Sequence, residues 1–252
     1  SSYANASGNL TGGTVIASAD ARGIYQSADG EVDASGDILN TSSSSIDVTA
    51  VGTAIGSGNA NAEATNVDAT GIDQEVEGEN GEALAEIANS GNISVLSSAT
   101  ASAQSGYASA RADALGISQD VNSEGLSATG IIDNSGSITN TAFAHANPVP
   151  GSASANANAD GIVQSIETSA NALASGSIVN SSDDTLAVTG VANANTAGSA
   201  WANASAGGTA IDQQIYASAD GEGTIDNSGT ILVNMIASAV APSGSAKANS
   251  RA

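Results

Sequence analysis

Hydrophobic and polar residues alternate along most of this chain with a period of two. Between positions 152 and 159 every second residue is alanine, and serine or asparagine fills the positions between. Similar alternation runs through 93–95 and 186–194. Because successive side chains of a strand point to opposite faces, this pattern predicts strands with one buried and one solvated face. Sequences rich in Gly, Pro, Asn and Ser separate the runs, so we expect only strands and turns.

The alternating segments recur with a period of about 46 residues. The tetrad Gly-Ile-x-Gln, with one Ala for Gly, ends in glutamines that are 48, 45, 45 and 49 residues apart. A second motif, Ile-x-Asn-Ser-Gly, has asparagines spaced by 45, 46 and 47 residues, with a degenerate copy at 32–36. Motifs that keep one common period are typical of a repeat protein in which each unit stacks on the next.

A unit of this length has too narrow an apolar face to bury by itself, so neighbouring units must cover it. We therefore predict an all-β, elongated parallel β-solenoid of about five repeats that occupies residues 1–252 as a single array. An irregular first unit is expected at about 23–70, where a bulge or loop should break the coil. The regular units are expected at 71–115, 116–160, 161–209 and 210–252. One large coil per unit and two coils of about 23 residues both fit the spacing.

Identical polar residues at equivalent positions predict hydrogen-bonded ladders between coils. Successive coils lie about 4.8 Å apart, so a side-chain amide reaches the copies above and below it. The asparagine ladder is expected at Asn89, Asn134, Asn180 and Asn227. The glutamine ladder is expected at Gln26, Gln74, Gln119, Gln164 and Gln213. The glycine after Asn-Ser is expected to take a positive φ, which lets the chain turn at little steric cost.

Composition narrows the expected partners. A net charge of −22 with only four Lys and Arg argues against nucleic acid and anionic membranes, because both bind basic surfaces. No apolar run approaches the roughly 18 residues that a membrane helix needs, so we expect no membrane insertion. Aromatic residues make up only 2 % of the chain, so alanine must supply much of a thin core. There is no cysteine, hence no disulfide framework.

Three phrases of the second motif suggest a family. Ile-Ala-Asn-Ser-Gly-Asn-Ile at 87–93, Ile-Asp-Asn-Ser-Gly-Ser-Ile at 132–138 and Ile-Asp-Asn-Ser-Gly-Thr-Ile at 225–231 resemble the repeats of bacterial autotransporter passenger domains and related large surface adhesins. The resemblance covers essentially the whole chain through its repeats. It implies an exported β-solenoid at the bacterial cell surface with an adhesive or structural role. The alanine-rich strands are smaller than the usual Ile/Val/Leu coils of that family.

Few residues are candidates for chemistry, and we expect no catalytic residue and no bound cofactor. The single histidine, His145, is expected to be an exposed strand residue. Carboxylates that alternate along a strand or follow one another in a turn are weak candidates for a bound cation such as Ca²⁺, with a solvated acidic surface as the alternative. These candidates are Asp73, Glu75, Glu77, Asp183 and Asp184.

Two aromatic residues are candidates for surface contacts. Tyr107 and Trp201 each precede an alternating alanine segment, so we expect them in one column of the array, with Ser154 between them and Lys247 beyond. Because the alanines that follow point inward, this column should point outward. Exposed aromatic rings stack on sugars or on a neighbouring filament.

These features favour a non-enzymatic structural subunit of an extracellular fibre or adhesin that associates head to tail with copies of itself. The segments 2–7 and 245–252 alternate alike, and we expect them to share one phase of the repeat, so that a second copy continues the stack. Surface glycans and host-cell receptors are further expected partners. The alternatives are a carbohydrate-active β-helix enzyme and an ice-binding or carbohydrate-binding solenoid.

Overall fold

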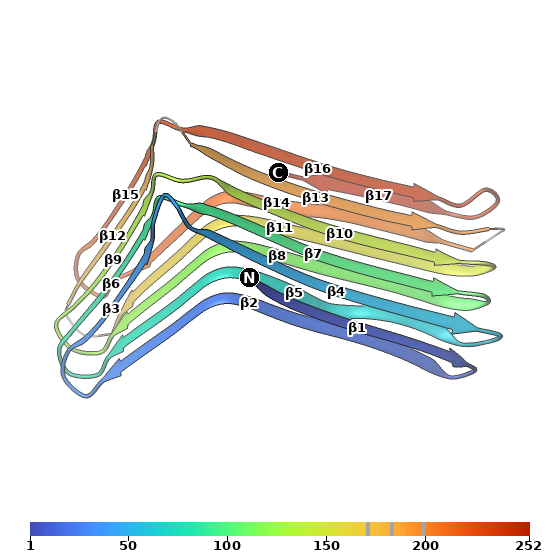
Figure 1. The fold of residues 1–252 in the computed structure, drawn as a ribbon, viewed down its shortest axis with the longest axis horizontal. Helices are drawn as coiled ribbons and strands as arrows, with labels where there is room; N and C mark the ends of the chain where they lie inside the picture. Colours follow the sequence, from blue (N-terminus) through green and yellow to red (C-terminus); the bar gives the residue numbers. More distant parts are fainter. Residues whose placement is uncertain (170–171, 182–183, 198–199) are drawn as a thin grey trace.

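The chain forms an all-β solenoid of three parallel sheets (Figure 1). The computed structural model describes residues 1–169, 172–181, 184–197 and 200–252. Sheet A consists of β1 (Ser2–Thr11), β4 (Ser45–Ser57), β7 (Asn92–Ala103), β10 (Ile138–Pro148), β13 (Thr185–Asn195) and β16 (Thr230–Val240). Sheet B consists of β2 (Thr14–Gly30), β5 (Asn61–Gly78), β8 (Gly106–Ser123), β11 (Gly151–Thr168), β14 (Ala202–Tyr216) and β17 (Ala246–Arg251). Sheet C consists of β3 (Ala34–Asn40), β6 (Glu82–Asn89), β9 (Ser127–Asn134), β12 (Leu173–Asn180) and β15 (Gly221–Asn227).

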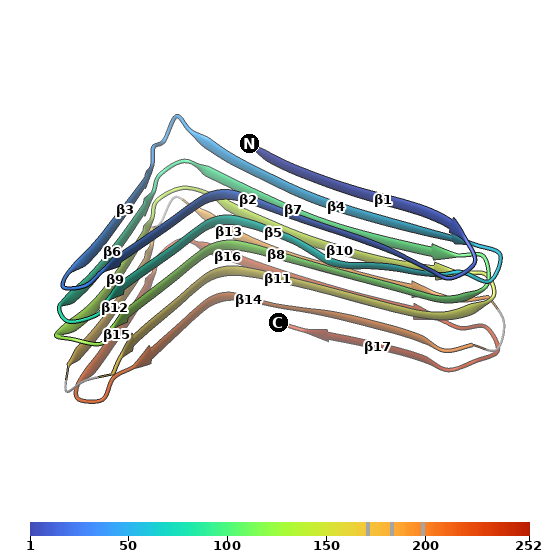
Figure 2. The ribbon, with the colours of Figure 1, turned by 90° about the horizontal axis from the view of Figure 1, so that it is seen from below.

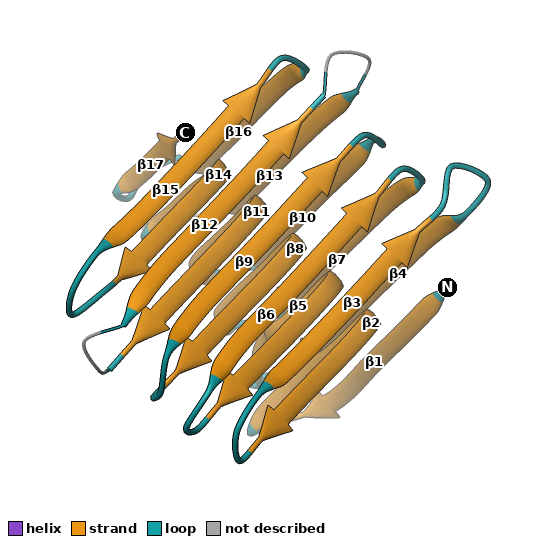
Figure 3. Ribbon diagram, turned by 90° about the vertical axis from the view of Figure 1, so that its left-hand side faces the viewer, coloured by secondary structure: helices purple, strands orange, loops and turns teal. Residues whose placement is uncertain are grey.

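Each sequence repeat forms one coil rather than two. The chain passes through sheets A, B and C in turn, and each strand then pairs in parallel with the equivalent strand of the next coil. Ile138, for example, pairs with Ile93 on one side and with Leu186 on the other. Figure 3 shows the strands of sheets A and C lying side by side, with those of each sheet running in the same direction. The predicted parallel solenoid is confirmed. Within the described residues no helix is long and apolar enough to cross a membrane.

The coils are bent, and sheet B lines the inside of the bend (Figures 1 and 2). Its long strands run along both arms, whereas sheet A covers one arm and sheet C the other. At the bend the alternation of burial breaks, and Gly116 and Ile117 of β8 are both buried. A Cβ on Gly116 would lie 2.6 Å from the carbonyl oxygen of Gly161 in the next coil. The Gly-Ile-x-Gln motif therefore marks the bend, and its glycine permits the close approach of neighbouring coils.

The core is thin in one arm and thicker near the bend. Between sheets A and B it consists mostly of alanine, for example Ala142 and Ala157, both fully buried. At the bend and between sheets B and C the larger residues Ile117, Ile132 and Ile138 fill the interior, and these are also fully buried. Because alanine methyl groups bury little area, much of the stability must come from hydrogen bonds between coils.

A bulge does lie within the unit expected at 23–70, but it is not near the degenerate motif copy. Asn40, at the end of β3, pairs with Asn89, so β2, β3 and β4 follow one another as in the later coils. The degenerate motif copy placed at 32–36 was misleading because it contains Ser-Gly, which the true copy at 38–40 lacks. The irregularity lies in the second coil, where the register of β5 shifts between Ala64 and Val67. Asn66 forms this bulge with a φ of 53°.

The glycines after Asn-Ser do not take the positive φ that the sequence suggested. Gly91, Gly136 and Gly229 are absent from the residues with positive φ in the described chain. A Cβ on Gly136 would lie 2.0 Å from the carbonyl oxygen of Gly91, and one on Gly229 would lie 2.3 Å from that of Ser181. Lack of space between stacked turns, rather than backbone conformation, requires glycine here.

The two ends of the chain do not share one phase of the repeat, which corrects a further expectation. Strand β1 pairs with β4 in sheet A, whereas β17 pairs with β14 in sheet B. The alternating alanine pattern is common to both sheets, so the sequence alone did not distinguish them. A copy stacked on the last coil would therefore place its β1 on β16, not on β17.

Candidate functional site

The asparagine ladder runs through five coils. The Nδ2 of Asn89 donates to Oδ1 of Asn134, and the Nδ2 of Asn134 donates to Oδ1 of Asn180, each at 2.7 Å. The same bond joins Asn180 to Asn227 at 2.7 Å. Asn40 extends the ladder by donating to Asn89 at 2.7 Å. The sequence analysis missed Asn40 because it placed the first copy of the motif too early.

The glutamine ladder connects coils in the opposite direction. Here the Nε2 of the later coil donates to Oε1 of the earlier one, as from Gln74 to Gln26 at 2.7 Å and from Gln119 to Gln74 at 2.9 Å. Gln164 and Gln213 continue it at 2.7 and 2.8 Å. The second hydrogen of the amide binds a carbonyl of sheet C, for example that of Gly36 at 2.8 Å from Gln74. This ladder therefore joins sheet B to sheet C as well as coil to coil.

A buried amide at the bend was not expected. Asn140 lies in a column that holds valine at Val48, Val95 and Val188, and it is fully buried. Its Nδ2 donates to the carbonyl oxygen of Asp160 at 2.7 Å. Its Oδ1 has no hydrogen-bond partner within the described chain. When the repeats are placed under one another, a single asparagine stands in a column of valines, and this exception could have predicted the buried amide.

The predicted cation ligands do not converge. Asp73 accepts a hydrogen bond from Arg22 at 3.3 Å, and Glu75 accepts one from Tyr25 at 3.2 Å. Asp183 lies outside the described residues, and the N–H of Asp184 donates to the carbonyl of Ser181 at 3.4 Å. Among the residues that the structure describes, no group of three or more His, Cys, Asp or Glu side chains could hold a metal ion. The weak Ca²⁺ site, with Glu77 as a further candidate, stays a prediction.

Carboxylates stacked on the outer face of sheet B repel one another. Burial raises the pKa of Asp68, and the facing carboxylate of Asp113 raises it further. Burial likewise raises the pKa of Asp120, with repulsion from Glu75 as the next cause. Burial also raises the pKa of Asp160, against hydrogen bonds that lower it. Asp68, Asp113 and Asp160, together with Arg111, line a shallow hollow of about 360 Å³ on this face.

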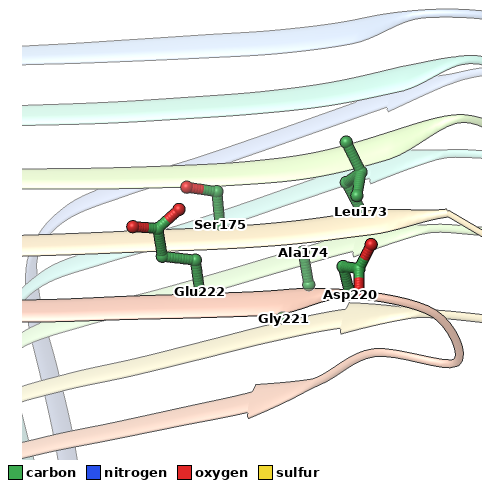
Figure 4. A pocket seen from close by; sticks show the side chains of 6 residues that line it. All are labelled: Leu173, Ala174, Ser175, Asp220, Gly221 and Glu222. Atoms are coloured by element: carbon green, nitrogen blue, oxygen red, sulfur yellow. The ribbon is translucent and has the colours of Figure 1, made fainter.

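A second hollow lies between β12 and β15. Its volume is about 540 Å³, and its lining residues are Leu173, Ala174, Ser175, Asp220, Gly221 and Glu222. In Figure 4 the carboxyl group of Glu222 extends toward Ser175, whereas that of Asp220 points in another direction. Two carboxylates that share a bond-cleaving role must flank one substrate atom.

The aromatic pair is present, although its column differs from the expected one. The ring centroids of Tyr107 and Trp201 lie 5.9 Å apart with an interplanar angle of 41°. The residue between them is Ser152, not Ser154: Ser152 pairs with Tyr107, and the N–H of Ala153 bonds to the carbonyl of Trp201. The column continues beyond Trp201 at Ser245, not at Lys247, because Ala202 pairs with Ala246. A shift by two residues preserves the alternation, so the pattern did not reveal it.

The lone histidine lies on the outer face of sheet A. His145 pairs with Thr100 on one side and with Asn193 on the other, and its side chain is half-buried. These neighbours carry a hydroxyl and an amide rather than a carboxylate. The position does not provide the partner that a catalytic imidazole requires.

No protein-family model, curated protein or solved structure matches this chain. The resemblance to autotransporter passenger repeats therefore stays a prediction, and the function has to be argued from the geometry.

Proposed function

We propose that this chain is a non-enzymatic structural segment of an extracellular bacterial surface fibre or adhesin. The observation that carries the proposal is the pair of amide ladders, which connect successive coils from Asn40 to Asn227 and from Gln26 to Gln213. The first five coils, from β1–β3 to β13–β15, are each bonded to the next through three sheets and two ladders, and β16 and β17 continue sheets A and B. Such a stack is stiff along its axis, and its length grows with the number of coils.

The location outside the cell is supported by the surface chemistry and the resemblance of the repeats. A net charge of −22 hinders indiscriminate association of a protein with many strand edges. The Ile-x-Asn-Ser-Gly phrases resemble those of exported surface adhesins, which fits the same setting. A spacer or adhesive stalk at the bacterial surface requires stiffness and solubility, and this chain combines both.

The last coil supports end-to-end association with a second copy. Ile225 is 50 % exposed, although the equivalent Ile178 one coil earlier is fully buried. Val233 is 36 % exposed, whereas Val188 in the same column is fully buried. These side chains point into the stack, and a further coil would cover them, whether it belongs to a second copy or to the same chain. A second copy that places β1 on β16 would cover the sheet A part of this surface and extend the fibre.

Sedimentation across a concentration series tests this assembly. We expect the wild-type chain to form species that grow with concentration, and Val233→Asp to abolish growth because it places a charge on the stacking surface. Leu39→Asp, on the outer face of sheet C, is the control and should assemble like the wild type. Wild-type chains that do not grow in length at any concentration would refute end-to-end assembly. A compact particle in small-angle scattering would refute the structural role itself.

A second candidate function is contact with neutral glycans through the aromatic pair. Trp201 is 45 % exposed, and the outer face beside it carries Ser154, Asn156 and Asn203. Aromatic rings bordered by hydroxyl and amide groups are suited to sugars, which present both apolar and hydroxyl faces. Binding of neutral oligosaccharides measured by Trp201 fluorescence and calorimetry tests the idea. Tyr107→Ala should weaken binding, and Tyr216→Ala, another exposed tyrosine of sheet B, should not. Equal effects of both variants would exclude this site.

A further inference from the structure

The outer face of sheet A is nearly free of charge. In the six strands of this sheet that the structure describes, Asp47 is the only Asp, Glu, Lys or Arg residue, and His145 is the one histidine. By contrast, the single strand β5 of sheet B carries five carboxylates: Glu63, Asp68, Asp73, Glu75 and Glu77. The net charge of −22 is therefore distributed over the other surfaces and spares this one.

The outward residues of sheet A are instead apolar or hydroxyl-bearing. The central column holds Val51, Ser98, Phe143, Val191 and Ile236. Phe143 and Ile236 are 42 % and 47 % exposed. The columns on either side contribute threonines at Thr49, Thr53, Thr100, Thr141 and Thr189. We call this outward surface of β1, β4, β7, β10, β13 and β16 the neutral face.

The neutral face is large enough for a stable contact. Six strands at about 4.8 Å and eleven residues at about 3.3 Å give roughly 1,000 Å². A standard protein–protein interface buries about 800 Å² on each partner. Phe143 belongs to the fourth strand of six and to the central column, and large apolar anchors near the centre of an interface contribute most of the binding energy.

We propose that the neutral face binds the neutral face of a second copy of this chain. Contact through sheet B or sheet C would bring like-charged carboxylates together, whereas this contact adds only one charged residue from each copy. The same patch is used twice under a two-fold axis, as in most homodimers. Two sheets packed in this way lie about 10 Å apart with side chains interdigitated. The contact is lateral, so it is independent of the end-to-end association proposed above and pairs two solenoids side by side.

Equilibrium sedimentation of variants tests the lateral pair. We expect Val233→Asp, which removes end stacking, to leave a discrete dimer. Adding Phe143→Asp should weaken that dimer at least tenfold, because the charge would be buried at the centre of the contact. Adding Leu39→Asp instead is the control, since Leu39 is also an exposed apolar residue, at 70 % against 42 % for Phe143, but lies on sheet C. Higher salt should strengthen the dimer by screening the repulsion between two acidic molecules.

Cross-linking provides a readout that does not depend on a destabilising charge. The natural chain has no cysteine, so single cysteines report proximity directly. Ser98, paired with Phe143 on the neutral face, can be changed to cysteine without enlarging the side chain much. Ser98→Cys should form a disulfide-linked dimer under mild oxidation, and Leu39→Cys should not.

Three results would overturn the proposal: a Val233→Asp chain that stays monomeric at all concentrations, equal effects of Phe143→Asp and Leu39→Asp, or equal cross-linking of both cysteine variants. A monomer that binds ice or an insoluble neutral polysaccharide through Phe143 would assign the neutral face to a different partner.

Discussion

Removing one amide from the middle of the asparagine ladder tests what holds the coils together. Asn134 is fully buried, accepts from Asn89 and donates to Asn180, both at 2.7 Å. Asn134→Ala leaves a buried donor on Asn89 and a buried acceptor on Asn180 without partners. Each orphaned group costs about 1–3 kcal/mol. We therefore expect the free energy of unfolding to fall by about 2–6 kcal/mol.

The end of the same ladder provides the matched control. Asn227 is exposed, accepts from Asn180 and donates to the nearby carbonyl of Gly229 at 3.3 Å, so Asn227→Ala orphans a single, partly hydrated ladder donor. Its cost should be near one net hydrogen bond, about 0.5–1.5 kcal/mol. Urea unfolding followed by far-UV circular dichroism measures both values, and hydrogen exchange shows whether the loss is local to the neighbouring coils. Equal costs at the middle and the end, or an unchanged midpoint for Asn134→Ala, would refute a ladder that stabilises through buried, mutually satisfied amides.

Three further predictions concern the bend and the acidic face. Gly116→Ala should lower the free energy of unfolding by about 2–4 kcal/mol in the same urea assay, since its Cβ would lie 2.6 Å from the carbonyl oxygen of Gly161. Gly207→Ala is the control and should be nearly neutral, because the nearest atom to its Cβ would lie at 3.5 Å. Asn140→Val should raise the free energy of unfolding by about 1 kcal/mol, seen as a higher melting temperature, because it removes the unpartnered Oδ1 and restores the valine of that column. A loss of stability would show that the hydrogen bond to the carbonyl of Asp160 contributes more. The free energy of unfolding should increase as the pH is lowered from neutral toward the raised pKa values of Asp68 and Asp120. Because these pKa values are higher in the folded state than in the unfolded state, the folded state binds protons at the two carboxylates more tightly, and protonation removes the cost of burying their charges. Asp68→Asn should flatten that dependence, and thermal melts that only fall with acidification would contradict it.

Much of the fold could be predicted because stacking makes the same demand in every coil. The Gln and Asn of each coil must meet their copies, so Gln119 and Asn134 recur with a constant period and are visible without any structure. Alternation likewise predicted the buried alanines, since it depends only on the pleat of a strand.

Features that depend on the phase between sheets were harder to predict. Ser152 and Ser154 fit the alternation equally well, and only the observed register places Ser152 beside Tyr107. The strands β1 and β17 look alike in sequence but belong to different sheets. The bend at Gly116 depends on how closely neighbouring backbones approach, which residue type alone does not show. The neutral face likewise emerged only when outward residues of separate strands were brought into one plane.

The opposite directions of the two amide ladders give the solenoid a polarity at its ends. Within the two described ladders, Asn40 donates without accepting and Asn227 accepts without donating, while Gln26 accepts without donating and Gln213 donates without accepting. The side-chain N–H groups of Asn227 and Gln26 bond backbone carbonyls instead, those of Gly229 and Asp37. In a coil added before the first one, the asparagine would have to donate to Asn40 and the glutamine would have to accept from Gln26. In a coil added after the last ladder residues, the asparagine would have to accept from Asn227 and the glutamine would have to donate to Gln213. Two like ends placed together would oppose oxygen to oxygen in one ladder and N–H to N–H in the other. If copies stack end to end as proposed, the side-chain amides therefore favour a single orientation of the added copy.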